Sequence, residues 1–132
     1  MAGVVVLDAG VLIALFQDTD VHHKWATDFA IITIESELAV SSVTLSEAMV
    51  HPARAGLLDQ YRASIEALEI SVLGFDASSA SQVAQLRATT GLKTSDAVVL
   101  QKALELQAEI ATTDQTLAKR ARELSIGVFQ PN

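Results

Sequence analysis

The chain has 132 residues, half of them hydrophobic and only 5% aromatic, so it can bury an aliphatic core as a single domain over residues 1–132. It contains no cysteine, which excludes a disulfide framework, a thiolate zinc site and a cysteine nucleophile. The net charge of −7 argues against a protein held to nucleic acid by broad basic patches, but it suits an acidic, cation-loaded site or a basic partner. No apolar run approaches the roughly 18 residues of a membrane span, and the N-terminus makes a poor signal peptide. We therefore expect a soluble, cytoplasmic protein without membrane contact.

The first predicted unit is a strand that runs into a helix over residues 4–16, an apolar stretch interrupted by one carboxylate. The valines at 4–6 suit a strand covered on both faces, because such strands are continuous apolar runs. Asp8 follows, and burying its ionised carboxylate without partners would be costly. It is either a functional group at the carboxyl end of the strand, where clefts form in open α/β sheets, or an N-cap of the helix. The residues leave both interpretations open.

Helical and strand patterns then alternate to the end of the chain. Residues 18–20 supply helix-start chemistry, and apolar residues follow at helical spacing, at Val21, Trp25, Phe29 and Ile32. The segment 44–47 matches the S/T-x-x-E capping box, which predicts a helix that begins at Thr44. Pro52 is expected to end or kink that helix near His51. Later helices are expected over 57–68, 76–87, 94–104 and 114–123, and strands over 38–41, 70–73, 109–112 and 126–129.

This order predicts the fold class. Strands separated by helical segments indicate an α/β protein with a mostly parallel central sheet of about five strands and helices on both faces. Thr94 or Ser95 is expected to cap the helix that carries Asp96 in its first turn, and Thr113 or Asp114 is expected to start the helix after the fourth strand.

Four acids occupy similar places in this scheme. Each is predicted at or just inside the start of a helix, and three of them closely follow strands, whose carboxyl ends share one edge of a parallel sheet: Asp8, Glu47, Asp96 and Asp114. Each taken singly is explained as a helix cap. Together, several carboxylates in one cleft would repel one another unless a hard cation neutralised them. Mg²⁺ or Mn²⁺ takes oxygen ligands, pairs naturally with phosphate and can activate a bound water.

Four segments resemble motifs of the PIN-domain family, in the order that the family has them: Val6–Ile13, Thr44–Ala48, Thr94–Leu100 and Ala111–Asp114. The segment 51–56 and the short chain add to the likeness, which covers essentially the whole chain. Together they resemble the VapC-type toxins of bacterial and archaeal toxin–antitoxin modules.

The resemblance implies a three-layer PIN-like domain that acts as a Mg²⁺- or Mn²⁺-dependent endoribonuclease, in which a metal-activated water attacks an RNA phosphodiester. Mapped onto this chain, Asp8, Asp96 and Glu47 would form the core of the metal site, Asp114 would complete it, and Thr112 would orient a ligand or water. The family also implies a homodimer and a cognate antitoxin, which often inserts a basic side chain into the acidic site.

One position departs from the family pattern. Family members often have Ser, Thr or Asn two residues after the first Asp, and Gly10 stands there in this chain. Gly10 would allow close approach of substrate, or Ser41, Ser42 or Thr112 would substitute for the missing group, or activity would be weaker. Substrate contact must come from local positive charge, for which the candidates are Lys93, Lys119, Arg120 and Arg54.

Two other functions compete with the ribonuclease. A catalytically weak PIN-like binding module would act through its partner surface; Gly10 favours it and the four acids argue against it. A signalling receiver domain is also small, acidic and α/β, but it needs a phosphoacceptor Asp at the end of a middle strand. Asp76, after the third predicted strand, fits a helix cap better.

Overall fold

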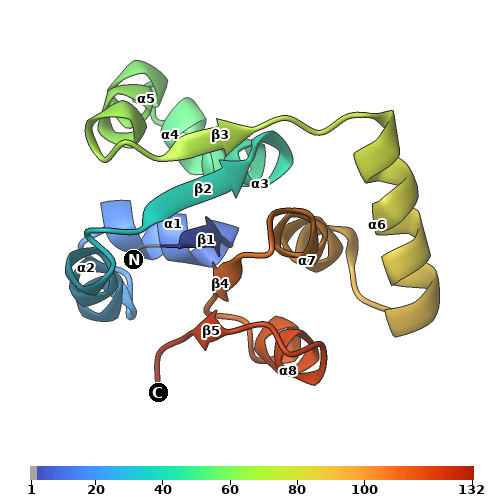
Figure 1. Cartoon of the computed structure of the whole chain (residues 1–132). Helices are drawn as coiled ribbons and strands as arrows, with labels where there is room; N and C mark the ends of the chain where they lie inside the picture. Colours follow the sequence, from blue (N-terminus) through green and yellow to red (C-terminus); the bar gives the residue numbers. More distant parts are fainter. Residues whose placement is uncertain (1–2) are drawn as a thin grey trace.

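A five-stranded sheet forms the centre of the structure, a computed structural model that describes residues 3–132. The strands are β1 Val4–Leu7, β2 Glu37–Ser41, β3 Ser71–Leu73, β4 Glu109–Ala111 and β5 Val128–Phe129. The helices are α1 Ala9–Phe16, α2 His23–Ile32, α3 Ser42–Ala48, α4 Val50–Arg54, α5 Leu58–Ala67, α6 Ala77–Thr90, α7 Thr94–Leu106 and α8 Gln115–Glu123. The strand order is β3-β2-β1-β4-β5, and every neighbouring pair is parallel (Figure 1). The α/β class and the parallel sheet predicted from the sequence are confirmed.

Strand β1 lies in the middle of the sheet, and its side chains are fully buried from Val5 to Leu7. Val6 is level with Ala39 of β2 on one side and with Ile110 of β4 on the other. A central strand with helices on both faces needs apolar side chains in both directions, which explains the unbroken valine run. Because all five strands are parallel, their carboxyl ends lie at the same edge of the sheet.

Helices cover both faces of the sheet and give three layers (Figure 1). On one face, Leu12 of α1, Phe29 of α2 and Ile65 of α5 pack in one apolar core. On the other face, Leu100 of α7 and Leu117 of α8 pack in a second core. None of the helices formed within residues 3–132 combines the length and the apolar character needed to cross a membrane.

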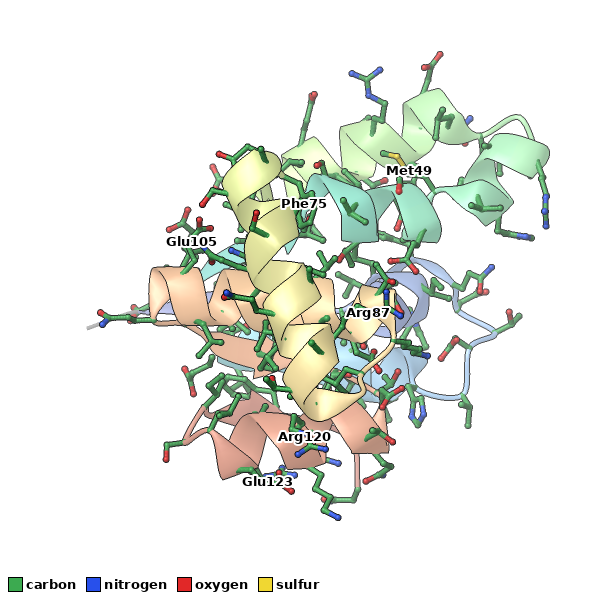
Figure 2. The ribbon with its side chains drawn as sticks, turned by 90° about the vertical axis from the view of Figure 1, so that its right-hand side faces the viewer. Met49, Phe75, Arg87, Glu105, Arg120 and Glu123 are labelled. Carbon is green, nitrogen blue, oxygen red and sulfur yellow. The ribbon has the colours of Figure 1, made fainter. Side chains whose placement is uncertain are left out.

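A buried lysine attaches α6 to α7. Lys102 is only 3% exposed, and its Nζ donates hydrogen bonds to Ser79 Oγ and to Glu105 Oε2, both at 3.1 Å. The same ammonium lies 5.7 Å from the centre of the Phe75 ring. Figure 2 shows Phe75 and Glu105 near the end of α6 at which that helix begins. The ammonium therefore joins the start of α6 to the C-terminal half of α7, where it is shielded from solvent.

The predicted capping box is wrong. Helix α3 begins at Ser42, and the Ser41 side chain caps it by accepting a hydrogen bond from the amide of Val43 at 3.2 Å. Since Ser41 is the last residue of β2, the chain turns directly from strand to helix, and Thr44 is buried inside the first turn. Glu47 is consequently the penultimate residue of α3 and not part of its start.

The helix break expected at Pro52 lies three residues earlier. Helix α3 ends at Ala48, and α4 starts at Val50, with Met49 as the cap between them. Pro52 is the third residue of α4, where its missing N–H costs little because the first amides of a helix have no partner within the helix. The interruption of the helix is therefore real, but proline does not cause it.

Other details also differ from the expectations. Val21 and Ile32 are 88% and 74% exposed, so the apolar face of α2 consists of buried Ala26 and Phe29 with Trp25 partly buried beside them. The N-cap of α7 is Lys93, and neither Thr94 nor Ser95 fills that position. Spacing alone does not distinguish the ends of an apolar run that face solvent from its middle, which faces the core.

We predict that Lys102→Ala lowers the free energy of unfolding by roughly 1–3 kcal/mol, because it leaves the buried hydroxyl of Ser79 without its partner. Urea denaturation followed by circular dichroism measures the change. Lys119→Ala, at an exposed position of α8, is the control and should change stability by less than about 0.5 kcal/mol. Equal stability of both variants would show that α6 does not depend on this contact.

Candidate active site

The four acids meet at the carboxyl edge of the sheet, although they come from four different helices. Asp8 caps α1, Asp96 lies in the first turn of α7, and Asp114 caps α8. Glu47 reaches the same region from the end of α3. Their charges act on one another: Asp114, Asp8 and Glu47 all raise the pKa of Asp96, and Asp8 raises that of Glu47. The structure thus brings all four sequence-predicted carboxylates into one electrostatic cluster.

Asp8 is both a helix cap and a member of this cluster. Its Oδ1 accepts a hydrogen bond from the amide of Ala9 at 2.8 Å, and its Oδ2 accepts one from the Thr112 hydroxyl at 2.6 Å. The side chain is buried, and this burial raises the pKa of Asp8 despite the two hydrogen bonds, with a further contribution from the Asp114 charge. The two interpretations of Asp8 are therefore compatible.

Thr112 and Asp114 form a turn that holds Asp8 in place. Thr112 is fully buried, and its Oγ1 accepts a hydrogen bond from the amide of Asp114 at 2.9 Å while it donates to Asp8. Asp114 Oδ1 accepts from the amide of Leu117 at 2.9 Å and caps α8. Its other oxygen, Oδ2, lies 3.8 Å from Lys93 Nζ. One oxygen of Asp114 is thus structural, and the other faces the cluster.

Asp96 is the most perturbed of the four. It is 4% exposed, and burial together with the charges of Asp114 and Asp8 raises its pKa to about 6. Glu47 differs because its side chain is exposed, yet partial desolvation and the nearby Asp8 still raise its pKa. Ionising all four carboxylates therefore costs free energy that a cation in their midst would recover.

Lys93 is a cation beside the cluster. Its charge lowers the pKa of Asp8, Glu47 and Asp96, although its side chain is 67% exposed. Arg120, by contrast, bonds to Glu123 Oε2 at 2.9 Å on α8, and Figure 2 shows both side chains on that helix. Of the cations named from the sequence, Lys93 is the one with a contact to a site acid.

The donor set fits a hard divalent cation held largely through water. All the side-chain donors in the cluster are carboxylate or hydroxyl oxygens, the type that Mg²⁺ and Mn²⁺ prefer. Within residues 3–132, no group of three or more His, Cys, Asp or Glu side chains is arranged to hold a metal ion directly. Mg²⁺ commonly keeps several waters and binds through one or two carboxylates. Buried Asp8 and Asp96 are the carboxylates best placed for that role.

Sequence reasoning missed one hydroxyl in the site, that of Thr113. A Cβ added to Gly10 would overlap Thr113 Oγ1 and lie 3.6 Å from Thr113 Cβ. The Thr113 hydroxyl therefore occupies the space that a side chain at position 10 would need. The one sign of Thr113 in the sequence is its position between the predicted site residues Thr112 and Asp114. Its contact with Gly10 could not be read from the sequence, because it depends on the pairing of β1 with β4.

An apolar groove of about 510 Å³ runs along α1, α4 and α5. Ile13 and Ala48 lie at the groove one helical turn or less from Ala9 and Glu47. The Tyr61 hydroxyl is buried without a hydrogen-bond partner among the described residues, and burial raises the pKa of Tyr61 to about 12. The lining residues are Ile13, Phe16, Gln17, Ala48, His51, Pro52, Leu57, Gln60, Tyr61 and Ser64.

Comparisons with known proteins find relatives of this fold. A family model described as PIN domain matches residues 5–123, and no curated protein matches the chain by sequence. The chain is similar to a toxin–antitoxin complex from Klebsiella pneumoniae, with 22% identity over 97% of this chain and 98% of that chain and a TM-score of 0.74. It is also similar to VapC20 from Mycobacterium tuberculosis, described as a sarcin–ricin loop cleaving toxin. The identity is 14% over 88% of this chain and 94% of that chain, with a TM-score of 0.77. A third similar structure is FitAcB from Neisseria gonorrhoeae, with 19% identity over 95% of this chain and 96% of that chain and a TM-score of 0.74.

We predict that Asp96→Asn stabilises the metal-free protein above pH 6. The pKa of Asp96 is raised from 3.8 to about 6, so its contribution to stability is complete below about pH 4 and is lost as the pH rises through about 6. Because the variant lacks this loss, its free energy of unfolding should exceed that of the wild type by on the order of 1–3 kcal/mol at pH 7.5 in EDTA.

Thermal unfolding at pH 4.0 and pH 7.5 measures this difference, which should vanish at the lower pH. Saturating Mn²⁺ should raise the melting temperature of the wild type by mass action and raise that of the variant less. A variant that melts below the wild type at pH 7.5 would instead make the Asp96 carboxylate a structural group.

Proposed function

Because the chain belongs to the PIN domain family, we propose that it is a divalent-metal-dependent endoribonuclease and the toxin of a toxin–antitoxin pair. The observation that carries this proposal is the convergence of Asp8, Glu47, Asp96 and Asp114 at one edge of the sheet, where burial and the neighbouring acidic charges raise the pKa of Asp8, Glu47 and Asp96. The description of the similar VapC20 as a sarcin–ricin loop cleaving toxin supports the choice of RNA as substrate.

Asp8 and Asp96 would hold Mg²⁺ or Mn²⁺ directly, with Glu47 and Asp114 contacting it through water. When bound, the ion supplies a water of lowered pKa and neutralises charge on the phosphodiester. Thr112 keeps the Asp8 carboxylate oriented through its 2.6 Å hydrogen bond. Exposed Glu47, whose pKa is raised, suits the uptake of a proton from the attacking water.

Lys93 would guide the RNA backbone to the site. The overall charge of −7 repels RNA, so binding needs positive charge placed locally. Lys93 Nζ lies 3.8 Å from Asp114 Oδ2 and is mostly exposed, so it can move to a phosphate without losing a buried contact. Screening by solvent keeps its pairing with Asp114 weak, which favours such an exchange.

We predict that the wild type cleaves RNA in Mn²⁺ or Mg²⁺ and not in EDTA. Asp96→Asn should lower the rate by roughly a hundredfold or more, the usual loss for an electrostatic group at the reacting centre. Lys93→Gln should mainly raise KM, by about three- to tenfold. The measurement is the time course of cleavage of a fluorescently labelled RNA hairpin.

Two charge-matched controls are at exposed positions outside the proposed site, Asp59→Asn on α5 and Lys24→Gln on α2. Both should cleave like the wild type. If Asp96→Asn also equals the wild type, any activity is a contaminant and the nuclease proposal fails. The catalytically weak binding module would then be the better account of this chain.

A basic protein partner also suits the site. The apolar groove along α1 and α5 is lined by Ala48, the residue after Glu47, so a segment with an arginine beside apolar residues would match both the cluster and the groove. The similar Klebsiella pneumoniae structure is described as a toxin–antitoxin complex, which supports an antitoxin as that partner. We include a homodimer in the proposal, as the family resemblance implies.

We predict that a hexa-arginine peptide binds the wild type and that Mn²⁺ displaces it, because both neutralise the same carboxylates. Isothermal titration calorimetry with and without Mn²⁺ measures this competition. Binding that Mn²⁺ leaves unchanged would place the peptide elsewhere on the acidic surface.

Light scattering tests the proposed homodimer, and a mass equal to one 14.0 kDa chain would contradict it.

A further inference from the structure

We propose that the Thr113 hydroxyl binds a phosphate oxygen of the substrate, and that position 10 is glycine because this hydroxyl fills its side-chain space. The inference rests on the proposed nuclease function and assigns a substrate-binding role to a residue beyond the four acids. It also gives a structural reason for the absence of a side chain at position 10.

The geometry places the hydroxyl, and not the methyl group, against Gly10. A Cβ on Gly10 would overlap Thr113 Oγ1, whereas it would lie 3.9 Å from Thr113 Cγ2, an ordinary contact. Gly10 is the second residue of α1, two positions after Asp8. The Thr113 oxygen is therefore held at the start of the helix that Asp8 caps, beside the acidic cluster.

The surrounding backbone is fixed, so the position of this hydroxyl is well defined. The amide of Thr112 donates to Phe129 O at 3.0 Å, and the amide of Asp114 donates to Thr112 Oγ1 at 2.9 Å. Asp114 then caps α8. Thr113 lies between these two anchored residues, which leaves mainly its own χ1 rotation to move Oγ1.

The two neighbouring threonines have different tasks. The Thr112 hydroxyl is fully used, because it donates to Asp8 and accepts from the amide of Asp114. The Thr113 hydroxyl makes no hydrogen bond with any residue in the described range 3–132, and its side chain is only partly buried. It is an available donor at the rim of the site.

An available donor at this place suits an anionic ligand. A phosphodiester that approaches Asp8 and Asp114 meets mainly acceptors, which repel its oxygens. A hydroxyl can donate to a phosphate oxygen, and it does so without adding a positive charge that would compete with a metal ion. Lys93, whose Nζ lies 3.8 Å from Asp114 Oδ2, supplies charge but not a fixed direction.

Any side chain at position 10 should displace this donor. Gly10→Ala would force Thr113 to rotate about χ1, and the hydroxyl would leave its present position although the fold tolerates the change. Gly10→Ser combined with Thr113→Ala should bring a hydroxyl back to the same region from α1. Either position 10 or position 113 can thus supply the hydroxyl, but both cannot do so together.

The experiment measures RNA affinity by fluorescence anisotropy in an Asp96→Asn background, and KM and kcat in the wild-type background. Thr113→Val keeps the shape and removes the hydroxyl, so we expect affinity to fall about five- to twentyfold with a matching rise in KM. Gly10→Ala should behave similarly. Thr113→Ser and the double variant Gly10→Ser/Thr113→Ala should recover most of the loss.

Thr89→Val removes an exposed hydroxyl that donates to Gln85 O within α6, and it is the matched control. If Thr113→Val binds and cleaves RNA like the wild type, the role of Thr113 is refuted while the nuclease stands. If the wild type does not cleave but Thr113→Val still binds RNA less well, the phosphate contact stands and the nuclease fails. A large fall in melting temperature shared by Thr113→Val and Thr113→Ser would reveal a structural role and overturn the inference.

Discussion

A hydrogen bond between the ends of two neighbouring strands determines how the carboxyl edge of the sheet is built. The Thr112 hydroxyl, just after β4, donates to Asp8 Oδ2, just after β1, at 2.6 Å. This bond and the Ala9 amide allow a carboxylate to be buried where it would otherwise be too costly. Each carboxylate oxygen can accept more than one hydrogen bond, so Asp8 remains able to bind a ligand while it begins α1. Position 8 therefore serves the fold and the site with the same two oxygens.

The free energy that holds the protein together comes from elsewhere. The two apolar cores on opposite faces of the sheet bury the aliphatic residues that make up much of the chain. The acidic edge opposes folding, because burial and mutual repulsion raise the pKa of Asp8, Glu47 and Asp96. Such a site persists because the cores compensate for it, as strained functional sites generally require. Asp96 shows this cost most directly, since it lies in the most buried stretch of α7.

The sequence was informative where one physical rule decided the outcome. A parallel sheet with helices on both faces follows from unbroken apolar strands, and carboxyl ends of parallel strands share an edge, so the meeting of Asp8 and Asp114 could be predicted. Glu47 was placed in the right region for a wrong reason, because Ser41 and not Thr44 caps α3. The contact between Gly10 and Thr113 could not be predicted, because it depends on the register of β1 against β4 and on one side-chain rotamer.

The shape of the sheet limits how copies of this chain can meet. Its two outer strands are short, with three residues in β3 and two in β5. Short edges offer few unpaired backbone groups to a strand from another molecule, which protects against edge-to-edge aggregation. A lasting association would therefore rely mainly on side chains of the helices, where apolar residues such as Ile31 of α2 and Leu58 of α5 are exposed. Substitutions of exposed helix residues could therefore change which partners the protein binds without disturbing the sheet.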